Sequence, residues 1–166
     1  MSKRSSIAIV TLTLACVVVA VWVLARSSES DAYLAILTPY ANSSTVLASN
    51  PSTCGINSSQ VSGVPAQLVS SFLAANAPGS KPISLSALNG SFAVADSKTL
   101  NRYIAAGVSP SVLLHGHDLV RLSRVGFNSD RSEALFCVEG RDGGLFYVRM
   151  QNGHWLLVNF VSTWVS

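Results

Sequence analysis

The hydrophobic positions in the last third of the chain, residues 119–166, fall into four runs rich in β-branched and aromatic residues, and turn-forming polar residues separate these runs. Ala134, Phe136 and Val138 share one parity in the second run. Phe146, Val148 and Met150 do so in the third, with Tyr147, Arg149 and Gln151 in the opposite parity. Asn152-Gly153 is typical of a two-residue type I′ hairpin, because both positions tolerate a positive φ. The pattern predicts a four-stranded antiparallel meander.

The first of these strands changes parity along its length. Val120 and Leu122 share one parity, whereas Val125 and Phe127 share the other. A β-bulge near Ser123-Arg124, with Gly126 easing the backbone, would bring both pairs onto one face. An unbroken ladder through residues 123–126 would contradict this hypothesis.

The last predicted strand begins near His154 and carries apolar residues in both parities. One predicted face holds Leu156, Val158 and Phe160, and the other holds Trp155, Leu157 and Val161. Apolar residues on both faces predict a central or doubly covered strand and not a bare edge.

Apolar residues at helical spacing predict helices in the middle of the chain. One helix, capped by Asp31, ends before Pro39, and a second lies within 64–76. A third is predicted over 96–107, and residues 45–48 are a candidate strand in a stretch rich in Ser and Asn. The expected fold class is α+β: an N-terminal transmembrane helix, then a small domain with two or three helices packed on one face of a C-terminal four-stranded antiparallel meander.

Residues 7–25 form an uncharged apolar run that, at about 1.5 Å per residue, spans roughly 28 Å, close to a bilayer core. Lys3 and Arg4 precede the run, so the positive-inside rule places the N-terminus in the cytoplasm and the rest outside. The expected organisation is a cytoplasmic N-terminus over 1–6, a transmembrane anchor or signal segment over 7–25, a hinge over 26–30 and an extracytoplasmic domain over 31–166. Cleavage after Ala25 would release a secreted protein, whereas an intact segment gives a single-pass membrane protein, periplasmic on its outer side in a Gram-negative cell.

The net charge of +3 comes from the flanks of this run. Three of the eleven basic residues are Lys3, Arg4 and Arg26, and the other eight balance the eight acidic residues. No basic stripe is present, so nucleic acid is not an expected partner and the lipid bilayer is the expected one, through 7–25.

The C-terminal third resembles a family of uncharacterised bacterial extracytoplasmic proteins that end in an SRVGFN…AL…NGxW…WVS pattern. The matching residues are Leu122 to Asn128, Glu133 to Leu135, Asn152 to Trp155 and Trp164 to Ser166. The chain departs from the family at 141–144, where its loop is shorter. The resemblance implies an extracytoplasmic bacterial setting and implies no activity.

Candidate chemistry is sparse. Ser123 is a candidate nucleophile for a serine-type hydrolase, but no Gly-x-Ser-x-Gly elbow presents it, and a locally bonded bulge residue is the simpler interpretation. His115 and His117 flank one residue and would form a weak metal site with help from Asp118, although metal sites usually need three or four ligands. No nucleotide-binding glycine motif is present, so no cofactor is expected.

Two further interpretations remain open. Cys54 and Cys137 would form a disulfide in an oxidising compartment, or Cys137 is a buried thiol. Five arginines in the C-terminal third would form either an anion-binding patch or surface ion pairs with the interleaved acids: Arg121, Arg124, Arg131, Arg141 and Arg149. The sequence therefore favours a membrane-anchored extracytoplasmic module that binds or supports a partner without catalysis, with the hydrolase and the metal carrier as alternatives.

Overall fold

The structure is a computed structural model, which describes residues 28–38, 45–49, 53–56, 61–81, 83–88, 91–95, 98, 102, 105–107, 118–140 and 143–162. The predicted membrane segment over 7–25 lies outside these residues, as does most of the third predicted helix. Among the described residues, no helix combines the length and the apolar character needed to cross a membrane.

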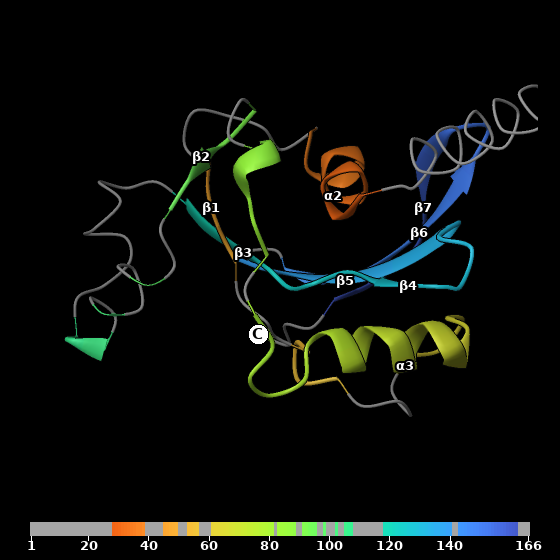
Figure 1. Cartoon of the computed structure of the whole chain (residues 1–166), viewed down its shortest axis with the longest axis horizontal. Helices are drawn as coiled ribbons and strands as arrows, with labels where there is room; N and C mark the ends of the chain where they lie inside the picture. Colours follow the sequence, from red (N-terminus) through yellow and green to blue (C-terminus); the bar gives the residue numbers. More distant parts are fainter. Residues whose placement is uncertain are drawn as a thin grey trace, which may run out of the picture.

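A mixed sheet of seven strands forms the centre of the molecule (Figure 1). Its order is β2-β1-β3-β5-β6-β7, with β4 also paired to β5. The strands are β1 (Thr45–Ser49), β2 (Ala93–Val94), β3 (Asp118–Leu122), β4 (Gly126–Phe127), β5 (Glu133–Glu139), β6 (Gly144–Gln151) and β7 (His154–Ser162). β1 runs parallel to both β2 and β3, and all the other pairs are antiparallel.

The prediction of a purely antiparallel four-stranded meander is therefore wrong. The C-terminal strands do pair in sequence order, but β1 adds a parallel strand beside β3. All five residues of β1 are buried, so this strand lacks the alternation by which a half-buried strand is recognised. The candidate strand over 45–48 is confirmed. Its parallel pairing was not predicted, because it depends on contacts with residues 118–122, far away in the sequence.

Helices cover both faces of the sheet, and the expectation of one covered face is also wrong (Figure 1). α2 (Glu29–Leu37) lies on one face with the short 3-10 helix η2 (Ser86–Leu88), and α3 (Ala66–Ala75) lies on the other. Each face needs its own cover because the inner strands carry buried apolar residues in both parities. Phe136 and Phe146 face α2, whereas Leu135 and Leu145 face α3.

Helices α2 and α3 confirm two of the three helical predictions, with one change at a cap. Ser28 is the N-cap of α2, and its hydroxyl accepts a hydrogen bond from the backbone N–H of Asp31. The Asp31 carboxylate accepts in return from the Ser28 N–H, so Asp31 is the third residue of a capping box and was wrongly predicted as the cap itself.

The predicted bulge is confirmed by the strand register. Leu122 pairs with Val138 of β5, and Gly126 pairs with Leu135. The three residues 123–125 thus lie opposite only two residues, 136–137. One extra residue on one of two paired strands is a β-bulge. All four apolar residues of the parity argument consequently pack on the α2 face: Val120, Leu122, Val125 and Phe127.

The hairpin between β6 and β7 also forms as predicted. Asn152 and Gly153 have φ values of 51° and 80°, the positive pair of a type I′ turn, and Gln151 pairs with His154. However, β7 is the last strand of the sheet within the described chain, and four of its apolar residues are 42–51% exposed, so the prediction of a central or doubly covered strand is wrong.

A second bulge explains why the parity of β7 was misread. Tyr147 pairs with Asn159 and the next residue, Val148, pairs with Leu157, so Val158 is the extra residue. Residues directly opposite each other in an antiparallel pair lie on the same face. Leu157 and Phe160 therefore share the α2 face, despite their different parity.

Candidate functional site

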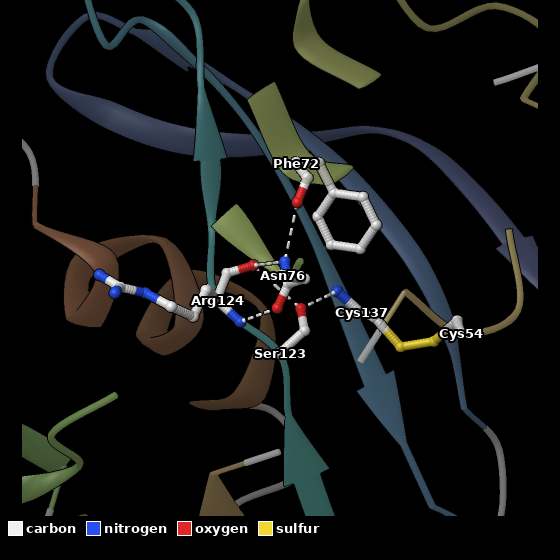
Figure 2. Close-up of a disulfide and its surroundings, with 6 residues drawn as sticks. All are labelled: Cys54, Phe72, Asn76, Ser123, Arg124 and Cys137. Carbon is white, nitrogen blue, oxygen red and sulfur yellow. Dashed lines mark hydrogen bonds between the residues drawn. A yellow bond between two sulfur atoms is a disulfide. The ribbon is translucent and has the colours of Figure 1, made fainter. Parts of the chain in front are cut away.

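The bulge between β3 and β4 contains the candidate nucleophile, Ser123, within a set of hydrogen bonds that we call the bulge network (Figure 2). Ser123 is 1% exposed. Its hydroxyl accepts from the backbone N–H of Cys137 at 2.8 Å and donates to the carbonyl of Arg124 at 3.0 Å. Its backbone N–H donates to the carbonyl of Cys137 at 3.1 Å. The serine thus replaces ladder bonds that the bulge interrupts.

Asn76, at the C-terminal end of α3, joins the helix to the bulge (Figure 2). Its side-chain oxygen accepts from the N–H of Arg124 at 2.8 Å, and its amide nitrogen donates to the Arg124 carbonyl at 2.9 Å. The same nitrogen donates to the Phe72 carbonyl at 3.0 Å, one turn back in the helix. Asn76 is 4% exposed, so these bonds form away from water.

Helix α2 contacts the bulge from the opposite face of the sheet. The Glu29 carboxylate lies 3.3 Å from Nε of Arg124 and accepts from the N–H of Val125 at 3.2 Å. The Tyr33 hydroxyl donates to the carbonyl of Ser123. Burial, with a smaller contribution from the charge of Glu29, raises the pKa of Tyr33 far above its ordinary value, so this phenol is neutral at physiological pH.

Gly126 completes this arrangement. A Cβ at this position would collide with the backbone nitrogen and Cα of Phe72, so the glycine lets α3 lie directly against β4. The Ser-Arg-Val-Gly segment therefore has a structural explanation at each position: a buried hydroxyl, an ion pair, a core side chain and a close helix contact.

A disulfide between Cys54 and Cys137 adjoins the bulge network (Figure 2). Their Cα atoms are 6.1 Å apart, an ordinary separation for such a bond. Cys54 lies in a turn where it and Gly55 both have positive φ, and the Ile56 N–H donates to the Thr53 carbonyl. Of the two interpretations of the cysteines, the structure has the disulfide.

Metal ligands gather at one place among the described residues, where Cys54, Cys137 and Glu139 have candidate ligand atoms within 4.8 Å of one another. Both sulfur atoms belong to the disulfide, so neither is a thiolate that can bind a metal ion. The predicted metal residues, His115 and His117, lie outside the described residues.

Ion pairs, rather than an anion patch, engage two of the five arginines. Arg124 pairs with Glu29, and Arg149 Nη2 lies 2.8 Å from the Glu133 carboxylate. Arg149 also donates to the Tyr147 hydroxyl at 2.7 Å, and the Tyr147 hydroxyl donates to Glu133 at 2.7 Å. Burial and the bond to Glu133 raise the pKa of Tyr147.

Trp155 and Tyr147 lie on opposite faces of the sheet. Trp155 packs in the core on the α2 face, and Tyr147 packs against α3 on the other face. The indole N–H of Trp155 is buried and has no hydrogen-bond partner among the described residues.

The edge strand carries the large apolar residues that are exposed in the described part of the chain, and we call them the β7 strip: Leu156 (46% exposed), Leu157 (51%), Val158 (44%) and Phe160 (42%). The sequence showed these residues but not their exposure, because the mistaken parity placed them on two covered faces. Asn76 was also missed, although an asparagine at the end of a predicted helix is a known C-terminal cap signal.

Among the described residues, no catalytic arrangement is assembled around Ser123. Ser123 has no described histidine beside it, since His154 begins the exposed β7 at the hairpin. Comparisons of this chain with profiles of protein families, with curated proteins and with solved structures found no match.

Proposed function

We propose that this protein is a non-catalytic binding or structural module that acts outside the cytoplasm. The observation that carries the proposal is the state of Ser123: both hydrogen-bonding roles of its hydroxyl are used within the fold, and its side chain is buried. A nucleophilic serine must reach a substrate and pass its proton to a base, and neither condition is met by this geometry.

Two features support the location. Disulfides persist in oxidising compartments and are rare in the cytosol, which agrees with the Cys54–Cys137 bond. The apolar run over 7–25, with basic residues before it, is typical of an export segment, either a membrane anchor or a cleaved signal. Membrane contact through 7–25 is part of the proposal.

The experiment on catalysis treats the full chain with a fluorophosphonate probe and with ester and peptide substrates. We expect no labelling and no turnover, in both the native protein and a Ser123→Ala variant. Labelling that disappears in Ser123→Ala would establish the hydrolase and overturn the proposal.

The experiment on location fuses alkaline phosphatase after Ser166, because this enzyme becomes active only where its own disulfides form. Activity of the fusion is expected, and an inactive but full-length fusion would contradict export. The metal alternative is checked separately by the metal content of the purified chain against a His115→Ala/His117→Ala variant.

A further inference from the structure

The free side of β7 is a surface to which another strand can be added. β7 (His154–Ser162) ends the sheet within the described chain. Along an edge strand, alternate residues direct their backbone N–H and C=O groups away from the sheet. The opposite edge, β2, is only two residues long, so an extended contact is available at β7 alone among the described edges.

β7 lacks most of the features that keep edge strands apart. Natural edges are protected by charged side chains, by proline, by shortness or by bulges. Residues 154–162 contain no Lys, Arg, Asp, Glu or Pro, and the strand is nine residues long. Its one protective feature is the bulge at Val158, which shortens the straight part of the edge.

We propose that β7 pairs with β7 of a second copy of this chain, antiparallel and about a two-fold axis, so that two sheets join into one. This inference rests on the proposed function as a binding module and names its partner. Self-pairing needs a surface that is complementary to itself. Because residues 154–162 carry no acid or permanent base, no antiparallel register places like charges opposite each other.

The β7 strip supplies the apolar area for this contact. Four side chains that are each nearly half exposed offer roughly 300 Å² per copy, taking about 150–200 Å² for a whole large apolar residue. With the usual polar share, an interface between two copies would bury at most about 1,000 Å², the lower limit for a specific contact. The predicted dimer is therefore reversible and not obligate.

Part of the strip is already held in place. Phe160 packs on Phe146 with ring centroids 4.8 Å apart, and Phe146 stacks on Phe136 at 5.7 Å. Tyr33 of α2 meets Phe136 edge-on at 5.1 Å. A side chain that is fixed before binding loses less conformational entropy when the partner arrives.

The test is sedimentation velocity of the full chain in detergent, over micromolar to millimolar concentrations, with Leu157→Lys and the matched control Gln67→Lys. Both changes add one positive charge at an exposed position, but Gln67 lies on α3, which packs on β4 and β5 and is not part of the edge strand. We expect a concentration-dependent dimer that Leu157→Lys weakens at least about tenfold, because it would bury an unpaired ammonium, and that Gln67→Lys leaves unchanged. A second measurement replaces Leu157 with the photo-crosslinker p-benzoylphenylalanine and maps the adduct by mass spectrometry.

Each outcome decides the proposal. An adduct of two chains joined within 154–162 supports it, together with the loss of the dimer in Leu157→Lys. A chain that remains monomeric, a dimer that Leu157→Lys does not weaken, or an adduct with another protein or with detergent alone overturns it. A monomer leaves the proposed binding function intact, whereas labelling of Ser123 by the serine probe overturns that function whatever the oligomeric state.

Discussion

Replacing Asn76 by alanine should destabilise the fold by breaking the link between α3 and the bulge. The change removes three hydrogen bonds, with lengths of 2.8, 2.9 and 3.0 Å. Two of the bonded carbonyls keep another donor: the Arg124 carbonyl accepts from Ser123, and the Phe72 carbonyl accepts from the backbone N–H of residue 76. Among these groups, only the N–H of Arg124 is left without a hydrogen-bond partner among the described residues.

The expected magnitude follows from this count. Each net hydrogen bond contributes about 1 kcal/mol, and one partly buried orphan donor adds roughly 1 kcal/mol more, so Asn76→Ala should lower the free energy of unfolding by about 2–4 kcal/mol. The measurement is urea unfolding of the oxidised full chain, followed by tryptophan fluorescence. Gln67→Ala, at an exposed position on the same helix, should change the free energy by less than about 0.5 kcal/mol.

An aspartate at position 76 gives a sharper test, because it keeps the acceptor but loses the donor. Its second oxygen would face the carbonyls of Phe72 and Arg124, so the buried carboxyl should have a pKa raised above about 3.9. A raised folded-state pKa contributes stability that is present below the unfolded value and is lost as pH rises through the folded value. Asn76→Asp should therefore recover stability, relative to the native chain, on going from neutral pH towards pH 4. Equal effects of pH on Asn76→Asp and Asn76→Ala would refute the assigned geometry.

Three other changes probe the same region. Replacing both Cys54 and Cys137 by alanine opens a link across a sequence separation of 83 and should cost about 2–5 kcal/mol, measured by the same urea unfolding; an unchanged midpoint would contradict the bond. Gly126→Ala forces a methyl group against the Phe72 backbone and should lower stability by about 1–3 kcal/mol or more, visible as a lower Tm; no loss of Tm would show that α3 can move away freely. The pKa of Tyr33 is raised above its ordinary value of 10.0, so the free energy of unfolding should fall by up to about 1.4 kcal/mol per pH unit above pH 10.0. Tyr33→Phe should lose this part of the dependence of stability on pH. The same dependence in both proteins would contradict the raised pKa of Tyr33.

Local features of the fold could be predicted from the sequence because their causes are local. The Asn152-Gly153 turn follows from two adjacent φ preferences, and the bulge at residues 123–125 follows from a change of parity within one strand. Helix α3 could also be predicted from local sequence, because its apolar stripe and the proline before it lie within about a dozen residues.

The predictions that were wrong concern features that depend on contacts between distant segments. The parallel pairing of β1 joins residues 45–49 to 118–122, and no local pattern specifies such a partner. The edge position of β7 was misread because a bulge at Val158 shifts the parity of its apolar residues, and a strand with apolar residues in both parities resembles a buried one. For the candidate site, Ser123 was correctly interpreted as a bulge residue, but its bonds to Cys137 required the register.

The bond between Cys54 and Cys137 also has a consequence for cleavage of the chain. These residues close a covalent ring that contains α3, η2, β2, β3 and β4. A protease that cuts once anywhere between the two cysteines leaves both products attached, so the nicked molecule keeps its mass apart from one added water. Only a reducing agent would separate the pieces, and a digest viewed without one would make the protein look resistant when it had already been cut.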